Sequence, residues 1–563
     1  MHNPSTVARP SIYYHYQVFK PWLSSAHGPQ EKKQVVVVGA GPAGMVTALE
    51  LARHGVASVV LASELQFSQG SRAIVFTRRS MEILQQVGVA HHITANGLPW
   101  RCGNSIYRGQ KVFRMETPHD PDDRFFPMLN IQQQYLEEYL YEACAANPLI
   151  DFRWGNKLIH AENVSGGVRA QIDTPEGAYT LDTDWLVAAD GGRSEIRSSM
   201  NLKLEGASFE SIFVIADIRI DLPYPTERLA FFDPDWNRGN TILMHKEPHG
   251  IWRVDYQLPP GETPEDALRP ESLKARINAQ LKMIGFEGTP WEMDWSSVYS
   301  ARTLTLPQYV HDRIVFTGDA AHLLPIFGVR GANTAFQDAQ SLGWHLAYVI
   351  QGHAPEKLMQ NHSLERVGAA REIITEAGKS TRFMAPPSRG FRLLRDAVLS
   401  LSLSEEFVRP LYHWRTSRPH EYSQSWLNSP CDDNALFQGG PGLGAPPQNV
   451  QLQKENFLLD HLGGSFDLVF VAQPSGIPQE ILHAVQDFKN QGIPLKLTAI
   501  TSAQNNIQGA DRTLVDPEKR FEQRYAVQPG GAYLFRPDQH ICARWHQLDA
   551  SRLQQSLRTS CMQ

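Results

Sequence analysis

The sequence contains few cysteines, and they form no recognisable set. There are five, an odd number, scattered along the chain and never in a Cys-x-x-Cys pair: Cys102, Cys144, Cys431, Cys542 and Cys561. Such spacing predicts neither a disulfide framework nor a zinc site. It is typical of a chain that stays in a reducing compartment, and we expect the cytoplasm.

The sequence also lacks an excess of basic charge and a long apolar run. Its 53 Lys and Arg against 59 Asp and Glu give a net charge of −6, which offers no positive field to a nucleic acid. No stretch reaches the roughly 18 apolar residues of a membrane span, and the N-terminus lacks the basic start and apolar core of a signal peptide. We therefore expect neither a nucleic-acid partner nor a membrane segment.

A glycine-rich turn near the N-terminus has the features of a dinucleotide-binding fingerprint. Gln34–Val38 is an apolar, β-branched run typical of a buried parallel strand, and Met45–His54 has helical spacing. Between them lies a G-x-G-x-x-G turn that contains Gly39, Gly41, Pro42, Ala43 and Gly44. Its three glycines allow a tight turn, a close approach of the backbone to a pyrophosphate, and close packing of helix on strand. A strand-to-helix turn without a ligand is the alternative.

The next predicted strand does not end in the expected acid. The strand is Ser58–Leu61, and the usual acidic position, which holds a ribose hydroxyl pair, falls on Ala62. The nearest carboxylate belongs to Glu64. Either the loop shifts so that Glu64 serves, or the ribose is held in another way.

Two later segments each place a glycine beside an aspartate after a buried strand. In Asp184–Met200 the strand ends in Asp190, which is followed by glycine, and in Arg313–Ala347 it ends in Gly318 and Asp319. The three motifs, in this order, resemble those of the class A flavin-dependent aromatic hydroxylases, the family of para-hydroxybenzoate hydroxylase, phenol hydroxylase and 3-(3-hydroxyphenyl)propionate hydroxylase. The resemblance covers residues 34–382.

This resemblance implies a non-covalently bound FAD. Asp319 would accept hydrogen bonds from the ribityl hydroxyls, which are strong bonds when the acceptor is charged; a helix N-cap is its alternative role. Gly318 and Pro325 belong to the same cofactor-binding segment. Acid treatment of the yellow protein should release the flavin, because no recognised flavinylation motif is present.

The helix after this segment would point its N-terminus at the flavin. We expect Gly331, Ala332 and Asn333 there, and the positive end of the helix dipole would favour the reduced, anionic flavin. The family often has Gly-Gln-Gly-Met-Asn where this chain has Val329-Arg330-Gly331-Ala332-Asn333. Arg330 could add positive charge beside the flavin, or it could point to solvent.

Three further positions match the family. Arg72, in Ser71-Arg72-Ala73, stands where the family has an arginine that reaches the pyrophosphate and the flavin; a surface arginine is the alternative. Gln133 matches a glutamine near the ribityl chain, or is an exposed helix residue. Asp190 is a structural cap, a contact to the pyrophosphate or nicotinamide cofactor, or both.

Between the two acidic motifs lies a segment with strand-like alternation of apolar residues. It runs from Phe209 to Arg302, with turns that favour antiparallel strands. His245, Arg253, Tyr256 and Tyr299 lie there and are candidates, from position alone, for assisting phenol deprotonation; we assign the role to none of them. No metal site is expected, because His245 and His249 lie around a turn without a third ligand.

The fold class expected is α/β: a Rossmann-like FAD-binding domain with an inserted antiparallel substrate domain and a C-terminal thioredoxin-like domain. The expected division is an N-terminal extension (1–33), a discontinuous FAD-binding domain (34–205 and 300–382, with 108–127 in the substrate wall), a substrate domain (206–299), a helical connector and linker (383–447) and the thioredoxin-like domain (448–563). The extension is dense in aromatic residues, which we expect to pin it to the body of the protein. We expect a helix over Phe391–Phe407 in the connector. In the tail, Arg524–Ala526, Gly530–Arg536 and Ala543–Trp545 resemble the closing strands of the thioredoxin-like domain. The tail lacks Cys-x-x-Cys, so we expect it to serve packing or dimerisation.

The resemblance implies a monooxygenase that uses NADH or NADPH, bound transiently, and O2 to hydroxylate a phenolic substrate through a flavin C4a-hydroperoxide. The alternatives are an epoxidase, a Baeyer–Villiger or decarboxylating monooxygenase on the same fold, and a flavin-bound protein without turnover. A homodimer is one expected assembly. Because every flavin motif lies before Arg382, a chain shortened to about Ser429 is expected to keep the flavin.

Overall fold

The structure is a computed structural model that describes residues 1–23, 32–70, 72–259, 261–325, 327–412, 418–429 and 432–562. Ser71 and Cys431, named above, lie outside the described residues. Within these ranges, no helix combines the length and the apolar character that crossing a membrane requires.

The first sheet carries the glycine and acidic motifs. Its strands follow the order β17-β18-β11-β1-β2-β8, and β10 and β9 continue from β11. Their bounds are Lys32–Val38 (β1), Ser58–Ala62 (β2), Ile150–Trp154 (β8), Lys157–Val164 (β9), Gly167–Thr174 (β10), Gly177–Ala188 (β11), Val310–His311 (β17) and Ile314–Phe316 (β18). Strands β18, β11, β1, β2 and β8 are parallel neighbours. Their carboxyl ends therefore meet at one edge of the sheet.

The apolar run of β1 is explained by burial on both faces. Val35 and Val37 belong to the core beneath the helices, whereas Val36 and Val38 belong to the core on the opposite face. The surrounding elements are α1 (Pro42–Arg53), α2 (Arg78–Gln86), α3 (Ala90–Asn96), α4 (Gln133–Ala146), α5 (Glu195–Ser199), η2 (Gly318–Ala320), α8 (Gly331–Ile350), α9 (Lys357–Met384), and a small sheet of β3 (Val75–Thr77), β7 (Met128–Asn130) and β4 (Leu98–Trp100).

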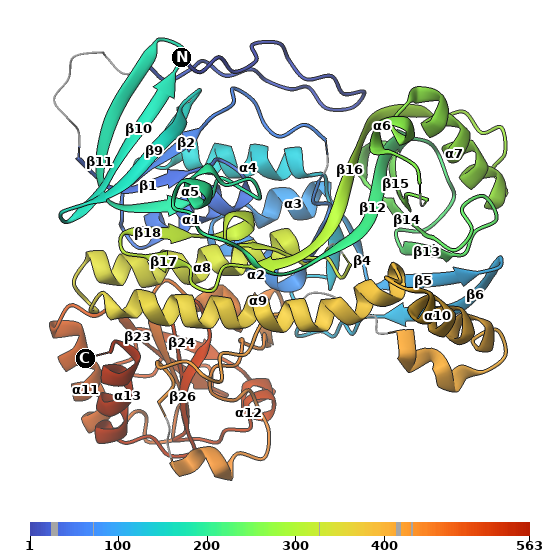
Figure 1. Ribbon diagram of the computed structural model, residues 1–563. Helices are drawn as coiled ribbons and strands as arrows, with labels where there is room; N and C mark the ends of the chain where they lie inside the picture. Colours follow the sequence, from blue (N-terminus) through green and yellow to red (C-terminus); the bar gives the residue numbers. More distant parts are fainter. Residues whose placement is uncertain are drawn as a thin grey trace.

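The second sheet forms the other lobe, and Figure 1 shows the long strands β12 and β16 leading into it. Its order is β19-β16-β12-β15-β14-β13-β5-β6. The bounds are Cys102–Tyr107 (β5), Gln110–Glu116 (β6), Glu205–Arg219 (β12), Arg228–Phe232 (β13), Thr241–Lys246 (β14), Ile251–Gln257 (β15), Glu292–Thr305 (β16) and His322–Leu323 (β19), with η1 (Pro248–Gly250), α6 (Pro264–Ala267) and α7 (Pro270–Met283). Val214, Val254 and Tyr256 pack with Leu273 and Ile277 of α7, so α7 covers one face of this sheet.

The C-terminal part has a third sheet with the order β24-β23-β22-β25-β26. Strand β22 is parallel to β23 and antiparallel to β25, and β26 is antiparallel to β25. The elements are β22 (Phe466–Val471), α11 (Gln479–Asn490), β23 (Leu495–Thr501), β24 (Arg512–Val515), α12 (Arg520–Tyr525), β25 (Ala532–Phe535), β26 (Ile541–Trp545) and α13 (Ala550–Ser560). A β-α-β unit followed by a hairpin and a last helix is the thioredoxin-like arrangement expected from the sequence.

Two local expectations were wrong. Arg524–Ala526 was expected to be a strand, but it is the end of α12: Phe521 and Tyr525, one turn apart, are buried with their rings 4.4 Å apart. A single helix was expected over Phe391–Phe407, but α10 (Arg389–Leu401) ends first and η3 (Glu406–Tyr412) follows. The remaining short elements are η4 (Asp432–Leu436), β20 (Gln451–Gln453), β21 (Asn456–Phe457) and η5 (Leu458–His461).

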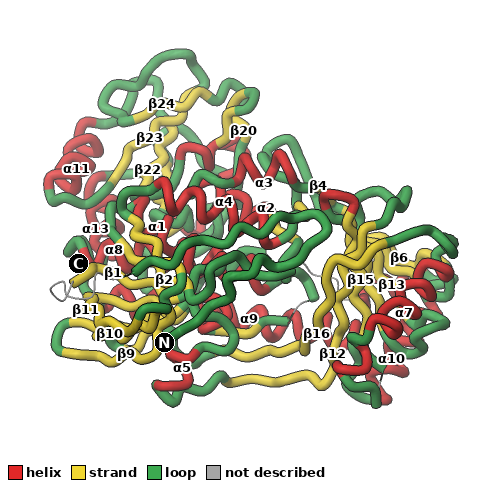
Figure 2. The backbone as a smooth tube through the Cα atoms, turned by 90° about the horizontal axis from the view of Figure 1, so that it is seen from above, coloured by secondary structure: helices red, strands yellow, loops and turns green. Residues whose placement is uncertain are grey.

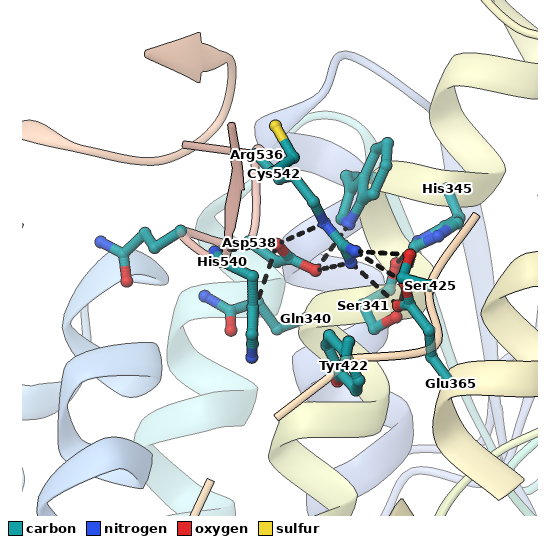
Figure 3. A network of polar contacts seen from close by, with 12 residues as sticks. Gln340, Ser341, His345, Glu365, Tyr422, Ser425, Arg536, Asp538, His540 and Cys542 are labelled. Atoms are coloured by element: carbon teal, nitrogen blue, oxygen red, sulfur yellow. Dashed lines mark hydrogen bonds and ion pairs between the residues drawn. The ribbon is translucent and has the colours of Figure 1, made fainter. Parts of the chain in front are cut away.

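A buried polar network joins the C-terminal part to helices α8 and α9 (Figure 3). Arg536 donates two hydrogen bonds to Glu365, at 2.6 and 2.9 Å, and pairs with Asp538 at 2.6 Å. The indole N–H of Trp344 also donates to Asp538, at 3.0 Å. Arg79 of α2 donates to the carbonyl of Asp538. Residues far apart in the sequence thus share one water-excluded cluster of charges.

The N-terminal segment lies across both lobes, and Figure 2 shows it as a long loop over the upper side. We call residues 1–22 the N-terminal strap. Tyr14 and Tyr16 are buried, and Phe19 stacks on Trp154 with 4.3 Å between ring centres. The expectation that aromatic residues pin this segment to the protein is confirmed. At its middle, the hydroxyl of Ser11 donates to Asp294 of the second sheet at 2.7 Å.

Candidate functional site

The three motifs meet where β1, β11 and β18 end. Gly39 has a φ of 111°, and a Cβ added there would lie 2.3 Å from the carbonyl oxygen of Ala189 at the end of β11. Gly318 has a φ of 57°, and its Cβ would lie 2.8 Å from the Cβ of Ala43 at the start of α1. Both positions need glycine, because a side chain would be strained and would push the motifs apart.

The start of α1 is shaped to receive an anion. Gly41 is the N-cap and has no side-chain cap, Pro42 follows it, and the first intrahelical N–H bond is donated by Met45. A Cβ added to Gly41 would meet nothing within 4 Å, whereas one added to Gly44 would lie 1.9 Å from the carbonyl oxygen of Gly39. The backbone N–H groups of the first turn therefore face open space at the positive end of the helix dipole.

Asp319 lies at the end of β18 with a carboxylate that has no hydrogen-bond partner among the described residues. Its side chain is exposed, yet the protein surrounds it closely enough that desolvation raises its pKa, against the positive charges of His322, Arg72 and Arg197. The carboxylate is therefore accessible from outside the protein although charged residues of the motifs surround it. The alternative role as an N-cap gains no support, because no backbone N–H reaches this carboxylate in the described chain.

Asp190 is a cap and also keeps an unused oxygen. One carboxylate oxygen accepts the N–H of Ile196, at 3.2 Å, at the start of α5, while the other is buried without a partner in the described structure. Burial raises the pKa of Asp190. Nearby, Arg197 donates to the carbonyls of Ala320 and Gly192, at 2.9 and 2.7 Å. Arg197 therefore ties the two acidic motifs together.

The start of α8 is held by the side chain of Asn333. Its oxygen accepts from Thr77 and Ser80, and its nitrogen donates to the carbonyls of Val75 and Val329. Both the oxygen and the nitrogen of the Asn333 amide are thus hydrogen-bonded within the protein, so only the backbone N–H groups at the start of α8 remain for a ligand. The helix begins at Gly331, and a Cβ added there would meet nothing within 4 Å.

Two side chains before α8 depart from the family pattern. Arg330 is buried, so the interpretation that it points to solvent is wrong. Val329 has a φ of 56°, a left-handed conformation that a β-branched residue rarely adopts and that favours glycine, the residue the family has there. In this chain the turn therefore has a left-handed residue at the position where the family pattern has glycine.

The loop that carries Arg72 is held by α4 and by the strap. Gln133 is buried, not exposed, and accepts the N–H of Ala73 at 3.0 Å. The N–H of Gly70 donates to the hydroxyl of Tyr16 at 3.1 Å. The side chain of Arg72 itself is exposed, and its positive charge acts on Asp319.

Glu64 and Pro325 are the two remaining residues expected to bind the cofactor. Glu64 is half-exposed and pairs with Arg9 of the strap at 3.3 Å, so its carboxylate already has a partner. Pro325 is buried between β19 and α8. The sequence could not show the pairing of Glu64, because Arg9 lies outside the fingerprint.

We call the face of the second sheet that α7 does not cover the free face. Part of it, around Phe232 and Leu243, packs on Phe383 of α9 and Leu399 of α10. The rest lies against the same elements. Arg253 of β15 donates to the carbonyl of Arg72, at 3.3 Å. Phe327, in the segment before α8, packs on Phe213, with ring centres 5.4 Å apart, and Phe213 stacks on Tyr299. This free face therefore combines an aromatic wall with charged residues, next to the loops that carry the flavin-type motifs.

The candidates chosen from position alone do not all lie on this face. His245, Arg253 and Tyr299 do, but Tyr256 lies on the opposite face, packed beneath α7. The prediction from the sequence did not include Asp217, Glu247 and Asp255, whose charges surround Arg253. Strand alternation was the available signal, because Asp217 and Asp255 each occupy the polar phase of an otherwise apolar strand.

The donor set fits an FAD. Two uncapped helix starts, two aspartates with unused oxygens and an exposed arginine stand around the convergence of three motifs. Backbone N–H groups and arginine suit a pyrophosphate, and carboxylates suit ribityl hydroxyls.

Comparison with known proteins agrees with this arrangement. The family model for the FAD binding domain matches residues 32–377. A 3-(3-hydroxy-phenyl)propionate/3-hydroxycinnamic acid hydroxylase of Klebsiella pneumoniae is 24% identical over 530 residues, which are 91% of this chain and 92% of the relative. The flavin-dependent monooxygenase PieE, solved with FAD and substrate, has a TM-score of 0.79 and 22% identity, over 95% of this chain and 99% of its own. Aklavinone-11 hydroxylase, solved with FAD and aklavinone, has a TM-score of 0.76 and 23% identity. The match covers 95% of this chain and 100% of that hydroxylase.

These findings confirm the resemblance, the fold class and the cofactor expected from the motifs. The family model spans more than half of the chain, and its limits include all three motifs. The protein belongs to the FAD-binding-domain family of flavoproteins.

Proposed function

We propose that this chain is an FAD-dependent monooxygenase that uses NADH or NADPH and O2 to hydroxylate a phenolic aromatic substrate. The observation that carries the proposal is the position of the free face of the second sheet. Its aromatic wall and its charged residues lie against the Arg72 loop and the segment before α8, which carry flavin motifs. The names of the hydroxylase relatives support the same reaction.

The positions of the residues around the three motifs support the following roles in binding FAD. The pyrophosphate would be held by the first turn of α1, with Arg72 and Asp190 beside it; the residues of that turn are Gly39, Gly41, Pro42, Ala43 and Gly44. Asp319 and Gln133 would serve the ribityl chain. Gly318 and Pro325 would shape the path to the start of α8, where Gly331, Ala332 and Asn333 would offer backbone N–H groups. Glu64 would hold the adenosine ribose by exchanging its pair with Arg9.

When bound, FAD would supply the redox chemistry, because it can accept electrons from NAD(P)H and pass them to O2. The chain would hold the substrate ring on the second sheet and exclude water from the reacting atoms. The uncapped start of α8 would stabilise negative charge that develops in front of it. The NAD(P)H would bind transiently, because the sequence contains a single dinucleotide fingerprint.

The proposal extends to assembly and location. A homodimer would cover the exposed Leu393 and Leu394 of α10 and the neighbouring Phe407. The four described cysteines are buried free thiols, which suits a cytoplasmic location.

A panel of phenols tests the reaction. Phenols should accelerate NAD(P)H oxidation by the holoenzyme, and O2 uptake should yield a product heavier by one oxygen atom. Peroxide without product from every phenol would favour a different substrate class, such as one that is epoxidised. A panel that gives neither stimulation nor oxygenated product would defeat the hydroxylase assignment and favour a flavoprotein without turnover.

A further inference from the structure

One carboxylate stands in the middle of the free face of the second sheet. Asp255 of β15 lies opposite Leu243 of β14 on one side and opposite Ile215 of β12 on the other. Its neighbours in the strand, Val254 and Tyr256, point to the core under α7. Alternation along the strand therefore turns Asp255 to the side that faces the flavin motifs.

Two different surfaces meet at Asp255. On this face, the next side chains in one direction along the strands belong to the aromatic wall. There Phe213, opposite Gln257, stacks on Tyr299 with 5.6 Å between ring centres. In the other direction the next level carries His245 and Arg253, which face each other across β14 and β15. Phe213 is fully buried, whereas Tyr299 keeps part of its side chain exposed, so a flat ring held against Tyr299 would place a polar substituent beside the carboxylate.

The charges around Asp255 balance without it. Arg253 makes a two-pronged pair with Asp217, at 2.8 and 2.9 Å, and lies 3.6 Å from Glu247. Arg228 of β13 supplies the second positive charge on this face. Arg228 acts on Asp255 itself, so with Asp255 ionised three carboxylates share two arginines and one negative charge stays unmatched in a buried place.

The carboxylate also lacks the hydrogen bonds that a buried acid normally has. Within the described chain no donor reaches Asp255, and one of its oxygens is fully buried. The Nδ1 atom of the buried His245 is likewise without a partner there. Buried polar groups in folded proteins are nearly always paired, so two unpaired groups side by side indicate that a bound molecule completes them.

We propose that Asp255 accepts the proton of the phenolic hydroxyl of the substrate, with His245 as a second hydrogen-bond partner of that oxygen. In this step the phenol O–H bond breaks, a carboxyl O–H bond forms on Asp255, and the electron pair stays on the phenolate oxygen. The phenolate is the more electron-rich ring and the better acceptor of an electrophilic oxygen. The assignment rests on the proposed function, and it identifies the substrate as a phenol with an ionisable hydroxyl.

The electrostatic surroundings suit a proton acceptor that works near neutral pH. Burial and the charge of Asp217 raise the pKa of Asp255 to about 7, against the lowering by Arg253 and Arg228. Tyr299 and His245 also face this group, and burial keeps both uncharged, since it raises the pKa of Tyr299 and lowers that of His245. Asp255 accepts a proton only when ionised, so turnover should rise as the pH rises through about 7.

The test compares Asp255→Asn with the wild-type holoenzyme on three probes: 3-(3-hydroxyphenyl)propionate, resorcinol and 4-nitrophenol. For the first two, kcat should fall about a hundredfold or more, the usual share of acid–base catalysis, and KM should change far less. The rise with pH should disappear. Asp255→Glu keeps a carboxylate and should restore part of the activity, and Asp221→Asn, on an exposed loop, is the matched control.

The acidic probe separates proton transfer from structural damage. 4-Nitrophenol is already ionised in mildly alkaline buffer. In that buffer Asp255→Asn should hydroxylate 4-nitrophenol nearly as fast as the wild type. An equal loss on all probes at all pH values, or no loss, would overturn the assignment. FAD content and melting temperature show whether each variant is folded, and Asp255→Glu provides the comparison if Asp255→Asn is not. Failure of the wild type on every phenol would instead count against the proposed function.

Discussion

Asp319 is the residue whose replacement tests the flavin site most directly. Its carboxylate has no partner in the described chain and is exposed at the end of β18, where the motifs meet. Asp319→Ala should weaken FAD binding by about 1.5–3 kcal/mol, the usual contribution of a hydrogen bond to a charged group, which is roughly tenfold or more in Kd. Titration of the apoprotein with FAD measures the change. Asp221→Ala is the control, and unchanged FAD affinity in Asp319→Ala would contradict the assigned role.

A second prediction for a single residue concerns Glu365 and the pH dependence of the free energy of unfolding. Burial opposes its ionisation, but Arg536 prevails and lowers the pKa of Glu365 from 4.5 to about 2. A lowered pKa in the folded state gives stability that is present above 4.5 and is lost as the pH falls toward 2. Glu365→Gln should therefore destabilise the protein at neutral pH by about 3–5 kcal/mol, the cost of breaking a buried pair.

Urea unfolding from neutral to acidic pH measures this effect. The stability of the wild type should decline over the acidic range, and the decline should be smaller in Glu365→Gln. Glu480→Gln, on the exposed side of α11, is the control. Coinciding stability curves for the wild type and Glu365→Gln would show that the pair with Arg536 contributes nothing, and parallel but separated curves would contradict the pH dependence.

Residues were predictable from the sequence where a local motif defines them. Gly39 and Gly318 stand in short patterns, and the structure gives each a physical reason, a positive φ and a backbone or methyl group less than 3 Å from the missing Cβ. Asp255 and Glu365 were not found. Their importance depends on partners in other strands and helices, such as Arg536, which lies 171 positions from Glu365.

At the scale of elements, the N-terminal strap positions the Arg72 loop. The hydroxyl of Tyr16 accepts the N–H of Gly70 at 3.1 Å and donates to the carbonyl of Ser68 at 3.2 Å. Tyr16→Phe would leave both backbone groups unpaired in a largely buried place. The expected cost is about 1–3 kcal/mol, with faster amide exchange at Gly70 and its described neighbours.

Hydrogen exchange with peptide resolution, together with the melting temperature, checks this prediction. Tyr135→Phe is the matched control, because the hydroxyl of Tyr135 makes no hydrogen bond within the described chain. If the loop exchanges equally in both variants, the strap does not hold it.

Elements were predictable where one periodicity extends over the whole segment. Strands β1 and β2 followed their apolar patterns, and their bounds differ from the expected Gln34–Val38 and Ser58–Leu61 by two residues and one residue. Prediction failed in the short segment Arg524–Ala526, which is the last turn of α12. Three residues carry too little pattern to separate a strand from a helix end, and the buried Phe521–Tyr525 pair decides the matter through packing.

At the scale of the molecule, the sequence indicated the units but not how they are joined. Every flavin motif precedes Arg382, so the sequence predicted that a chain shortened to about Ser429 keeps its flavin. The structure changes this expectation. Trp344 and Tyr348 of α8, with Leu358 of α9, share a buried core with Phe466 and its neighbours in the C-terminal part. The helix that begins at the flavin site therefore has its far end embedded in the tail.

Removal of the residues after Ser429 should therefore prevent stable folding of the flavin domain. The shortened chain would expose Trp344 and Tyr348, and Glu365 would lose Arg536, which leaves a buried carboxylate without its positive partner. We expect little soluble protein and a low ratio of FAD to protein, measured by absorbance after gel filtration. Coexpression of residues 430–563 as a separate chain should restore both, because the missing surface and charge return. A shortened chain that is soluble and carries as much FAD as the full chain would mean that α8 keeps its position without the tail.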